Sequence, residues 1–173
     1  MTIGQKKRTH RKHSVALVIT LIAGAAILIA AAGMSFWQPA TSVAQDDSDL
    51  VVYKRADCSC CSKWVAHLRE NGLAVTVRTV SSTLPIQERL GVPAVLRACH
   101  TAQAGAYWIE GHVPADLVKR LVTEQPQDVR GLAVPGMPVG SPGMEGPNPE
   151  PYSVMRVNPE GAVDVFATRS GAE

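Results

Sequence analysis

Three cysteines within four residues constrain this chain more than any other feature of its sequence: Cys58, Cys60 and Cys61. They follow a short β-branched and aromatic run, residues 50–53, that predicts a buried strand. They lead into residues 61–70, in which apolar side chains recur at helical spacing. At the N-terminus of a helix the helix dipole favours the thiolate, which is both nucleophile and metal ligand. The sequence therefore places reactive sulfur atoms between a strand and a helix.

The segments that follow continue this alternation of strands and helices. We expect strands over residues 73–80, 95–101 and 106–112, and helices over residues 84–90 and 114–123. The full order is strand, helix, strand, helix, strand, strand, helix, which predicts an α/β fold of the thioredoxin-like type, a three-layer sandwich. Pro93 directly precedes the third predicted strand. We expect a cis peptide bond before it, because only X-Pro bonds have a cis state of low energy.

Residues 126–151 differ in composition, since 12 of these 26 residues are Pro or Gly. Such a run has neither a helical nor a strand period. Alternation returns over residues 151–166, around a turn at residues 158–161, and predicts a terminal β-hairpin. We therefore expect residues 45–125 to form a thioredoxin-like metal-binding domain, and residues 126–173 to form a Pro/Gly-rich extension that wraps across it.

Residues 1–44 predict export from the cytoplasm. Five of the 17 basic residues lie in the first 13 positions, and an uncharged apolar run follows over residues 15–32. With the small residues Ser42 and Ala44, these are the parts of a signal peptide cleaved after Ala44. Because 18 apolar residues also reach the lower limit for spanning a bilayer, an uncleaved anchor is the alternative. In both cases residues 45–173 lie outside the cytoplasm, and only the N-terminal segment contacts the membrane.

The charge of the exported part argues against nucleic-acid binding. Outside the first 13 positions, 12 basic residues are outnumbered by 15 acidic residues. A protein that neutralises phosphates needs a basic face on its folded domain. We therefore expect no nucleic-acid partner.

All four cysteines of the chain, including Cys99, lie in this exported part. Neighbouring thiols in an oxidising compartment are disulfide-bonded, metal-bound or redox-active. A disulfide exchanger has no need for Cys60, so the third thiol favours metal ligation. Thiolates select Cu(I), whereas structural zinc usually takes two separated Cys/His pairs. Four thiolates carry more charge than one Cu(I) needs, and we therefore expect several copper ions bridged by sulfur.

Three further residues are candidate ligands: His100, Met137 and Met144. Because neighbours in a strand point to opposite faces, only one of His100 and Cys99 should face the cysteine trio, unless a bulge or strand end relaxes that limit. The two methionines lie in the polar extension, where they have no core to fill, although methionine also fills irregular surface gaps.

The other histidines and aromatic residues of the exported part carry weaker signals. His112, at a predicted strand end, suits a metal ligand and a helix cap equally well. His67 lies on the same side of its helix as Cys60, but we expect it to be solvated. Trp64, Tyr107 and Trp108 are interpreted as packing residues.

Four ordered motifs resemble the CxCC-containing, CopG-like family of bacterial periplasmic metal-binding proteins. They are CSCCSKW at 58–64, LGVPAVLRACHT at 90–101, IEGHVP at 109–114 and GLAVPGMPVGSPGM at 131–144. The resemblance covers roughly residues 50–168. It implies a thioredoxin-like domain with a metal-binding extension, a copper site at the CxCC turn, a role in copper resistance, and interconversion of Cu(I) and Cu(II).

Carried onto this chain, the copper-thiolate role falls on Cys58, Cys60 and Cys61. Cys99, Met137 and Met144 also match the pattern of the family. The resemblance further implies a periplasmic location, with copper ions as ligands and a copper efflux system or a periplasmic electron donor as partner.

Two other functions remain open from the residues alone. A thiol-disulfide oxidoreductase would use Cys58 and Cys61, but the chain lacks the Trp-Cys-Gly-Pro-Cys pattern of thioredoxins. A small disulfide-stapled binding module is a weaker alternative, because the adjacent Cys60 and Cys61 make poor staples for distant segments. The sequence leaves open whether the protein is an enzyme. If it is one, we expect a copper oxidoreductase.

Overall fold

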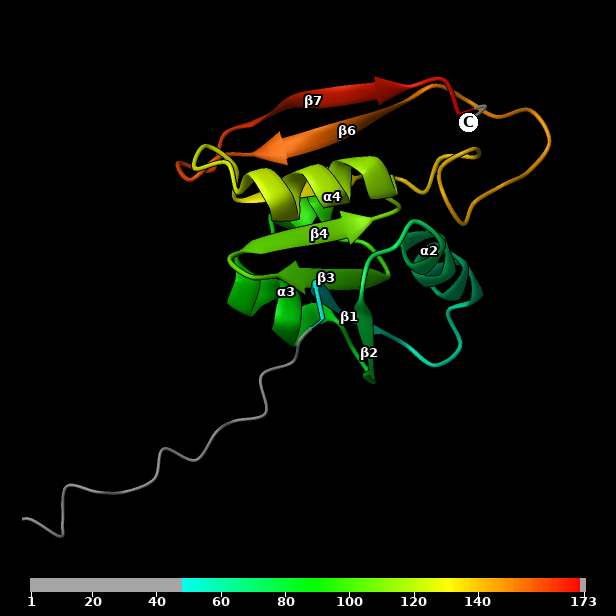
Figure 1. The fold of residues 1–173 in the computed structure, drawn as a ribbon, viewed down its shortest axis with the longest axis horizontal. Coiled ribbons are helices and arrows are strands. Elements are labelled where there is room, and N and C mark those ends of the chain that lie inside the picture. Colours follow the sequence, from blue (N-terminus) through cyan, green and yellow to red (C-terminus); the bar gives the residue numbers. More distant parts are fainter. Residues whose placement is uncertain (1–47, 172–173) are drawn as a thin grey trace, which may run out of the picture. The chain divides into compact units, whose positions relative to one another are not determined.

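The buried strand predicted after residue 49 lies in the middle of a four-stranded α/β unit. In the computed structural model, which describes residues 48–171, β1 (Leu50–Lys54) pairs in parallel with β2 (Val75–Thr79). On its other side β1 pairs antiparallel with β3 (His100–Ala104), which pairs antiparallel with β4 (Tyr107–Gly111). The antiparallel pairing brings the start of β3 beside the end of β1, where the cysteine motif follows (Figure 1).

The described residues contain three α-helices: α2 (Ser59–Glu70) connects β1 to β2, α3 (Leu84–Leu90) lies between β2 and β3, and α4 (Ala115–Glu124) follows β4. α2 begins directly after Cys58, and α3 ends at Leu90, because the next residue, Gly91, has a left-handed φ of 72° that closes the helix. The observed order of helices and strands up to α4 is the predicted one. The α/β class is confirmed.

Helices cover the sheet on both faces. The neighbouring β4 residues Trp108 and Ile109 point to opposite sides of the sheet, as successive strand residues do. Ile109 packs in the larger apolar cluster with residues of α2 and α4, such as Trp64 and Leu121. Trp108 packs in a second cluster with Leu96 and other residues that follow α3. The sheet is therefore the middle layer of three.

The segment that leads into β3 differs from the prediction. Residues 94–96 form a short 3-10 helix, and the strand begins only at His100. The peptide bond before Pro93 is trans, since the described residues contain no cis bond, so the expected cis-proline is wrong. Pro93 caps the 3-10 helix instead, with its carbonyl accepting from the amide of Leu96. Residues 97–99 are consequently irregular backbone, which frees Cys99 from strand alternation.

The Pro/Gly-rich extension adds three strands to the same sheet. β5 (Gly131–Val134) pairs in parallel with β4, and β6 (Tyr152–Val157) and β7 (Val163–Arg169) follow in antiparallel pairing. The full order is β2-β1-β3-β4-β5-β6-β7. The predicted terminal hairpin is therefore confirmed. β5 is not predicted, because all four of its residues are buried and the strand shows no alternation.

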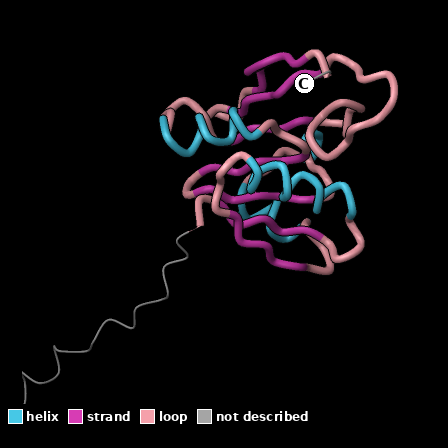
Figure 2. Tube along the Cα trace, turned by 45° about the vertical axis from the view of Figure 1, so that its right-hand side comes forward, coloured by secondary structure: helices cyan, strands magenta, loops and turns pink. Residues whose placement is uncertain are grey.

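The loop between β5 and β6 is one of the long loops drawn in pink in Figure 2, and it packs against the start of α2. Gly143 packs closely against α2: a Cβ there would lie 2.8 Å from the amide nitrogen of Trp64 and 3.0 Å from the carbonyl oxygen of Cys60. The loop thus contacts the first turn of α2, which carries the cysteines.

The described residues, 48–171, belong to one compact unit. The predicted signal peptide or anchor, residues 1–44, lies outside the described residues. Within residues 48–171 no helix has the length and apolar character needed to cross a membrane. The predicted domain boundary at residue 125 falls at the end of α4 and stays a prediction.

Candidate metal centre

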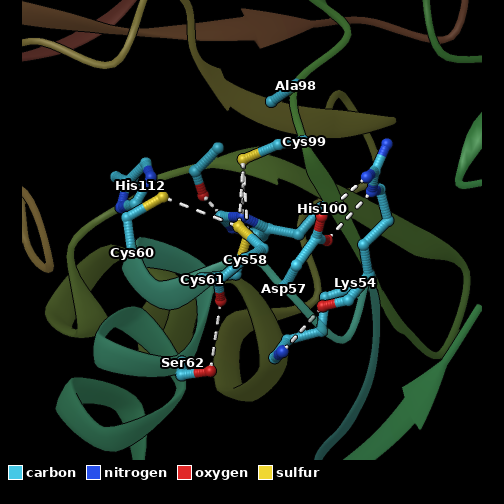
Figure 3. Close-up of a disulfide and its surroundings, with 12 residues drawn as sticks. Lys54, Asp57, Cys58, Cys60, Cys61, Ser62, Ala98, Cys99, His100 and His112 are labelled. Carbon is cyan, nitrogen blue, oxygen red and sulfur yellow. Dashed lines mark hydrogen bonds and ion pairs between the residues drawn. A yellow bond between two sulfur atoms is a disulfide. The ribbon is translucent and has the colours of Figure 1, made fainter.

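All four cysteines of the chain meet between the first turn of α2 and the irregular bend before β3 (Figure 3). The Sγ atom of Cys58 lies 3.6 Å from that of Cys60 and 3.6 Å from that of Cys99. The Sγ atom of Cys61 lies 3.3 Å from that of Cys99. The bend before β3 therefore brings the fourth cysteine to the trio, across 38 residues of sequence.

Two of these sulfur atoms are oxidised in the structure. Cys58 and Cys61 form a disulfide, whereas Cys60 and Cys99 are free thiols. Reduction of the disulfide would give four thiols whose sulfur atoms all lie within 4.8 Å of one another. The same four residues can thus form either a two-electron redox pair with two bystander thiols or a set of four thiolate ligands.

The Cys99 thiol is poorly suited to act as a nucleophile. Burial, followed by the neighbouring Cys60, raises the pKa of Cys99 to about 11. A thiol with such a pKa is protonated at neutral pH, and only a thiolate attacks a disulfide. A metal cation reverses this preference, because coordination deprotonates the thiol.

His100 offers a nitrogen atom to the same cluster. Its Nε2 lies 2.9 Å from the carbonyl oxygen of Gly111, which can only accept, so Nε2 carries the proton and Nδ1 keeps its lone pair. That Nδ1 lies 3.8 Å from the Sγ atom of Cys99. The ring is fully buried and packs on Trp64 at 4.5 Å between centroids. Burial lowers the pKa of His100 to about 3, so the ring is neutral and its Nδ1 can bind a metal.

His112, which the sequence leaves between a ligand and a cap, presents a second nitrogen atom. Its Nδ1 donates to the carbonyl oxygen of Pro142 at 2.7 Å, which leaves Nε2 unprotonated. This Nε2 is buried and has no hydrogen-bond partner. A ring nitrogen of His112 lies within 4.8 Å of the ligand atoms of Cys99 and His100. An orphaned buried lone pair is costly, and a metal ion would satisfy it, so the donor set fits a metal.

Gly111 explains why the two histidines and the bend meet. Its φ is 68°, and a Cβ at this position would lie 2.5 Å from the carbonyl oxygen of Val134. Only glycine allows β4 to end this close to β5 while its own carbonyl holds His100. Its neighbour His112 then turns toward the cysteines. Gly111 is part of the motif at residues 109–114, but the sequence does not show that its carbonyl oxygen binds the ring of His100.

The two methionines of the extension occupy different surroundings. Met144 is half-buried and lines a cavity of about 370 Å³ together with Cys60, Lys63 and Glu145. Met137 is 45% exposed and does not line that cavity. Met144, but not Met137, thus lines the cavity that Cys60 also lines.

His67 is not the solvated residue that the sequence predicts. It is half-buried, and its Nε2 accepts a hydrogen bond from the amide of Ala115 at 3.1 Å, at the start of α4. The interpretation of Trp64 and Trp108 as packing residues is confirmed, since both are almost completely buried, and Tyr107 packs partly buried against the core.

Comparisons with known proteins find one sequence family and two solved structures that resemble the chain. Residues 96–144 match a sequence family described as a protein of unknown function, DUF411. Among curated proteins, none matches the chain. Two solved structures, titled copper resistance protein CopG, form 1 and form 2, are each 39% identical to the chain with a TM-score of 0.65. Each covers 69% of this chain, and the match spans 95% of the form 1 chain and 96% of the form 2 chain.

Proposed function

Because the chain belongs to the CopG family of copper resistance proteins, we propose that it is a periplasmic copper-binding protein of copper resistance. The observation that carries the proposal is the convergence of four cysteine sulfur atoms with two neutral histidine nitrogen atoms. Sulfur-rich sites select Cu(I), and imidazole is a ligand that copper also accepts. The predicted N-terminal export signal supports the periplasmic location.

The ligands are the thiolates of all four cysteines after reduction, Nδ1 of His100 and Nε2 of His112. Cys99 belongs to both groups of potential ligands, one with the other cysteines and one with the two histidines. A sulfur atom shared between two groups supports the binding of several copper ions bridged by thiolate. Met144 is a further ligand from the cavity beside Cys60, whereas Met137 is a candidate through its sequence motif alone.

The cysteines also supply electrons for interconversion of Cu(I) and Cu(II). Oxidation of the Cys58 and Cys61 thiolates to the disulfide seen in the structure releases two electrons, which reduce two Cu(II) ions to two Cu(I) ions. A periplasmic electron donor then reduces the disulfide and restores both thiolates. Cu(I) leaves toward a copper efflux system. In this cycle the protein is a copper oxidoreductase.

A thiol-disulfide oxidoreductase is the second candidate, favoured by the disulfide between Cys58 and Cys61 at the N-terminus of α2. Two observations favour copper over exchange. Cys60 and Cys99 lie against the disulfide, where an exchanger would form wrong pairs. The orphaned Nε2 of His112 has no task in exchange.

The two functions separate in one pair of assays on the same preparation. The metal-free protein is tested for insulin reduction, and the anaerobically reduced protein is titrated with Cu(I) against a competing chelator. We expect tight copper binding and insulin reduction close to the rate without protein. Robust insulin reduction without copper binding would overturn the proposal.

A further inference from the structure

The backbone of the bend that carries Cys99 is held by side chains rather than by a strand ladder. Residues 97–99 lie outside every helix and strand, so their amide and carbonyl groups need other partners. The amide of Ala98 donates to Oε2 of Glu110 at 2.8 Å. The carbonyl oxygen of Ala98 accepts from Nε2 of Gln87 at 3.0 Å. Both polar groups of the residue before Cys99 are therefore held by side chains.

Glu110 is the centre of this network. Its side chain is fully buried, and its Oε2 also accepts from Nε2 of Gln87 at 3.0 Å. Its Oε1 accepts from the hydroxyl of Thr101. The donors come from α3, from the bend and from β3, while Glu110 itself lies in β4. Burying a carboxyl group costs free energy unless hydrogen bonds compensate for the lost hydration. The carboxyl group of Glu110 accepts three such bonds, which an apolar residue at this position could not accept.

Three successive residues at the end of β4 thus act on the candidate metal centre in different ways. Glu110 holds the bend beside Cys99, Gly111 holds the ring of His100 through its carbonyl oxygen, and His112 presents its own Nε2. The bend has no ladder bonds of its own to keep the Sγ atom of Cys99 at 3.3 Å from that of Cys61.

We propose that Glu110, assisted by Gln87, is a positioning residue that fixes Cys99 against the CxCC turn. Its carboxyl group holds Ala98, and through Ala98 it sets the place of the Cys99 sulfur and of the adjoining His100. The importance of this placement for copper rests on the proposed function, but the placement itself can be measured without copper.

The chain offers a conservative variant and a matched control. Glu110→Val removes every acceptor of the network, whereas Glu110→Gln keeps one amide oxygen for Ala98 and Gln87 and can donate to Thr101. Thr101→Val breaks one bond to the same carboxyl group without touching the bend. A purely stabilising role of the network predicts that all three variants affect stability alone.

The measurement uses the Cys58→Ser, Cys60→Ser background of the full chain, in which only Cys61 and Cys99 remain. Their disulfide is equilibrated with reduced and oxidised glutathione, and the equilibrium constant gives their effective concentration. We expect Glu110→Val to lower it by about tenfold or more, because a displacement of about 1 Å can cost on the order of a hundredfold. Glu110→Gln should restore most of the value, and Thr101→Val should leave it unchanged.

An unchanged effective concentration in a folded Glu110→Val protein would overturn the inference, and so would an equal loss in Thr101→Val. Folding is checked by circular dichroism and thermal unfolding. If Glu110→Val does not fold, Gln87→Leu takes its place, because it removes only the bonds from α3. An unchanged effective concentration in Gln87→Leu, or an equal loss in Thr101→Val, would then overturn the inference.

A parallel Cu(I) titration of each variant in the four-cysteine chain distinguishes this inference from the proposed function. Absence of copper binding in the parent chain would contradict the proposed function, but the result on the position of Cys99 would still hold.

Discussion

The Sγ atom of Cys99 lies 3.3 Å from the Sγ atom of Cys61, although 38 residues separate the two cysteines. Cys61 is fixed because it is fully buried in the first turn of α2. Cys99 reaches it from a bend that is neither helix nor strand. This contact joins the CxCC motif to the two histidines and turns a redox-type cysteine pair into a candidate metal centre.

Cys60 separates copper binding from disulfide exchange. Cys60→Ser removes the free thiol that lies beside Cys58 and lines the cavity with Met144, but leaves the Cys58–Cys61 pair intact. We expect Cu(I) affinity to fall by roughly a hundredfold, since thiolate is the ligand that selects Cu(I). Chelator competition measures the loss. The control is Ser62→Ala, which alters the same turn without removing sulfur, and equal affinities of the two variants would contradict the assignment.

The histidines can be tested by replacements that keep their anchoring bonds. His112→Asn retains a donor near the position of Nδ1 for Pro142 and removes the orphaned Nε2. We expect copper affinity to fall by about tenfold or more. The stability of the metal-free protein should stay the same or rise by about 1 kcal/mol, because a buried unsatisfied atom is lost. If His112→Asn loses much stability in urea unfolding and keeps its copper affinity, His112 is a structural residue and not a copper ligand.

The corresponding replacement at the neighbouring ring is His100→Gln. The glutamine amide can still donate to the carbonyl oxygen of Gly111, but it no longer offers a nitrogen lone pair beside Cys99. X-ray absorption of the copper-loaded variant should show fewer nitrogen neighbours than the parent protein. An unaltered nitrogen contribution would exclude His100 as a ligand.

The extension is tested where it touches α2. Gly143 and Gly161 have nearly equal φ values of 87° and 86°, but only at Gly143 would a Cβ meet other atoms within 3 Å. Gly161→Ala therefore measures the backbone cost alone, about 1 kcal/mol. Gly143→Ala should cost about 2–4 kcal/mol, because it pushes the loop from the turn of Cys60, and it should also weaken copper binding. Similar losses in urea unfolding for both variants would show that the loop does not pack as described.

His67 gives stability a pH dependence that is independent of metal. Burial lowers the pKa of His67, so the unfolded chain takes up a proton at a higher pH than the folded protein does. Stability is therefore complete above the unfolded pKa of about 6.5 and is lost as the pH falls toward the folded value. In His67→Gln an amide oxygen can accept from Ala115 at every pH. Urea unfolding between about pH 7.5 and about pH 5 should show a smaller loss for the variant, and parallel curves would contradict this role.

The sequence predicts the order of the elements up to α4 because each has a local signal. α3 begins at Leu84 and ends at Leu90 as predicted, since Gly91 takes the left-handed conformation that stops a helix. β5 has no such signal, because a strand buried on both faces does not alternate. The sequence predicts the start of β3 too early. The apolar residues 94–96 suit a strand locally, but in the structure Pro93 caps a 3-10 helix there.

The candidate site is only partly visible in the sequence. The CxCC spacing identifies the cysteines, but the ligand character of His112 depends on Pro142, which lies 30 residues away and takes up the other ring nitrogen. Strand alternation predicts that only one of Cys99 and His100 faces the trio, unless a bulge or strand end relaxes that limit. The structure has this exception, because β3 begins only at His100 and Cys99 lies in the bend before it.

The redox state of the cysteines should control copper uptake. The structure with the Cys58–Cys61 disulfide contains two free thiols, Cys60 and Cys99, and full reduction gives four. We expect the reduced protein to bind more copper than the oxidised protein, in proportion to the thiols that a colorimetric reagent counts. Equal copper uptake by both forms would show that these two sulfur atoms are not ligands.

The most direct test is the metal content and X-ray absorption spectrum of the anaerobically reduced protein after copper loading and removal of unbound metal. The account predicts several copper ions per chain, in the Cu(I) state and surrounded mainly by sulfur. A single bound zinc ion, or no bound metal after loading, would contradict it.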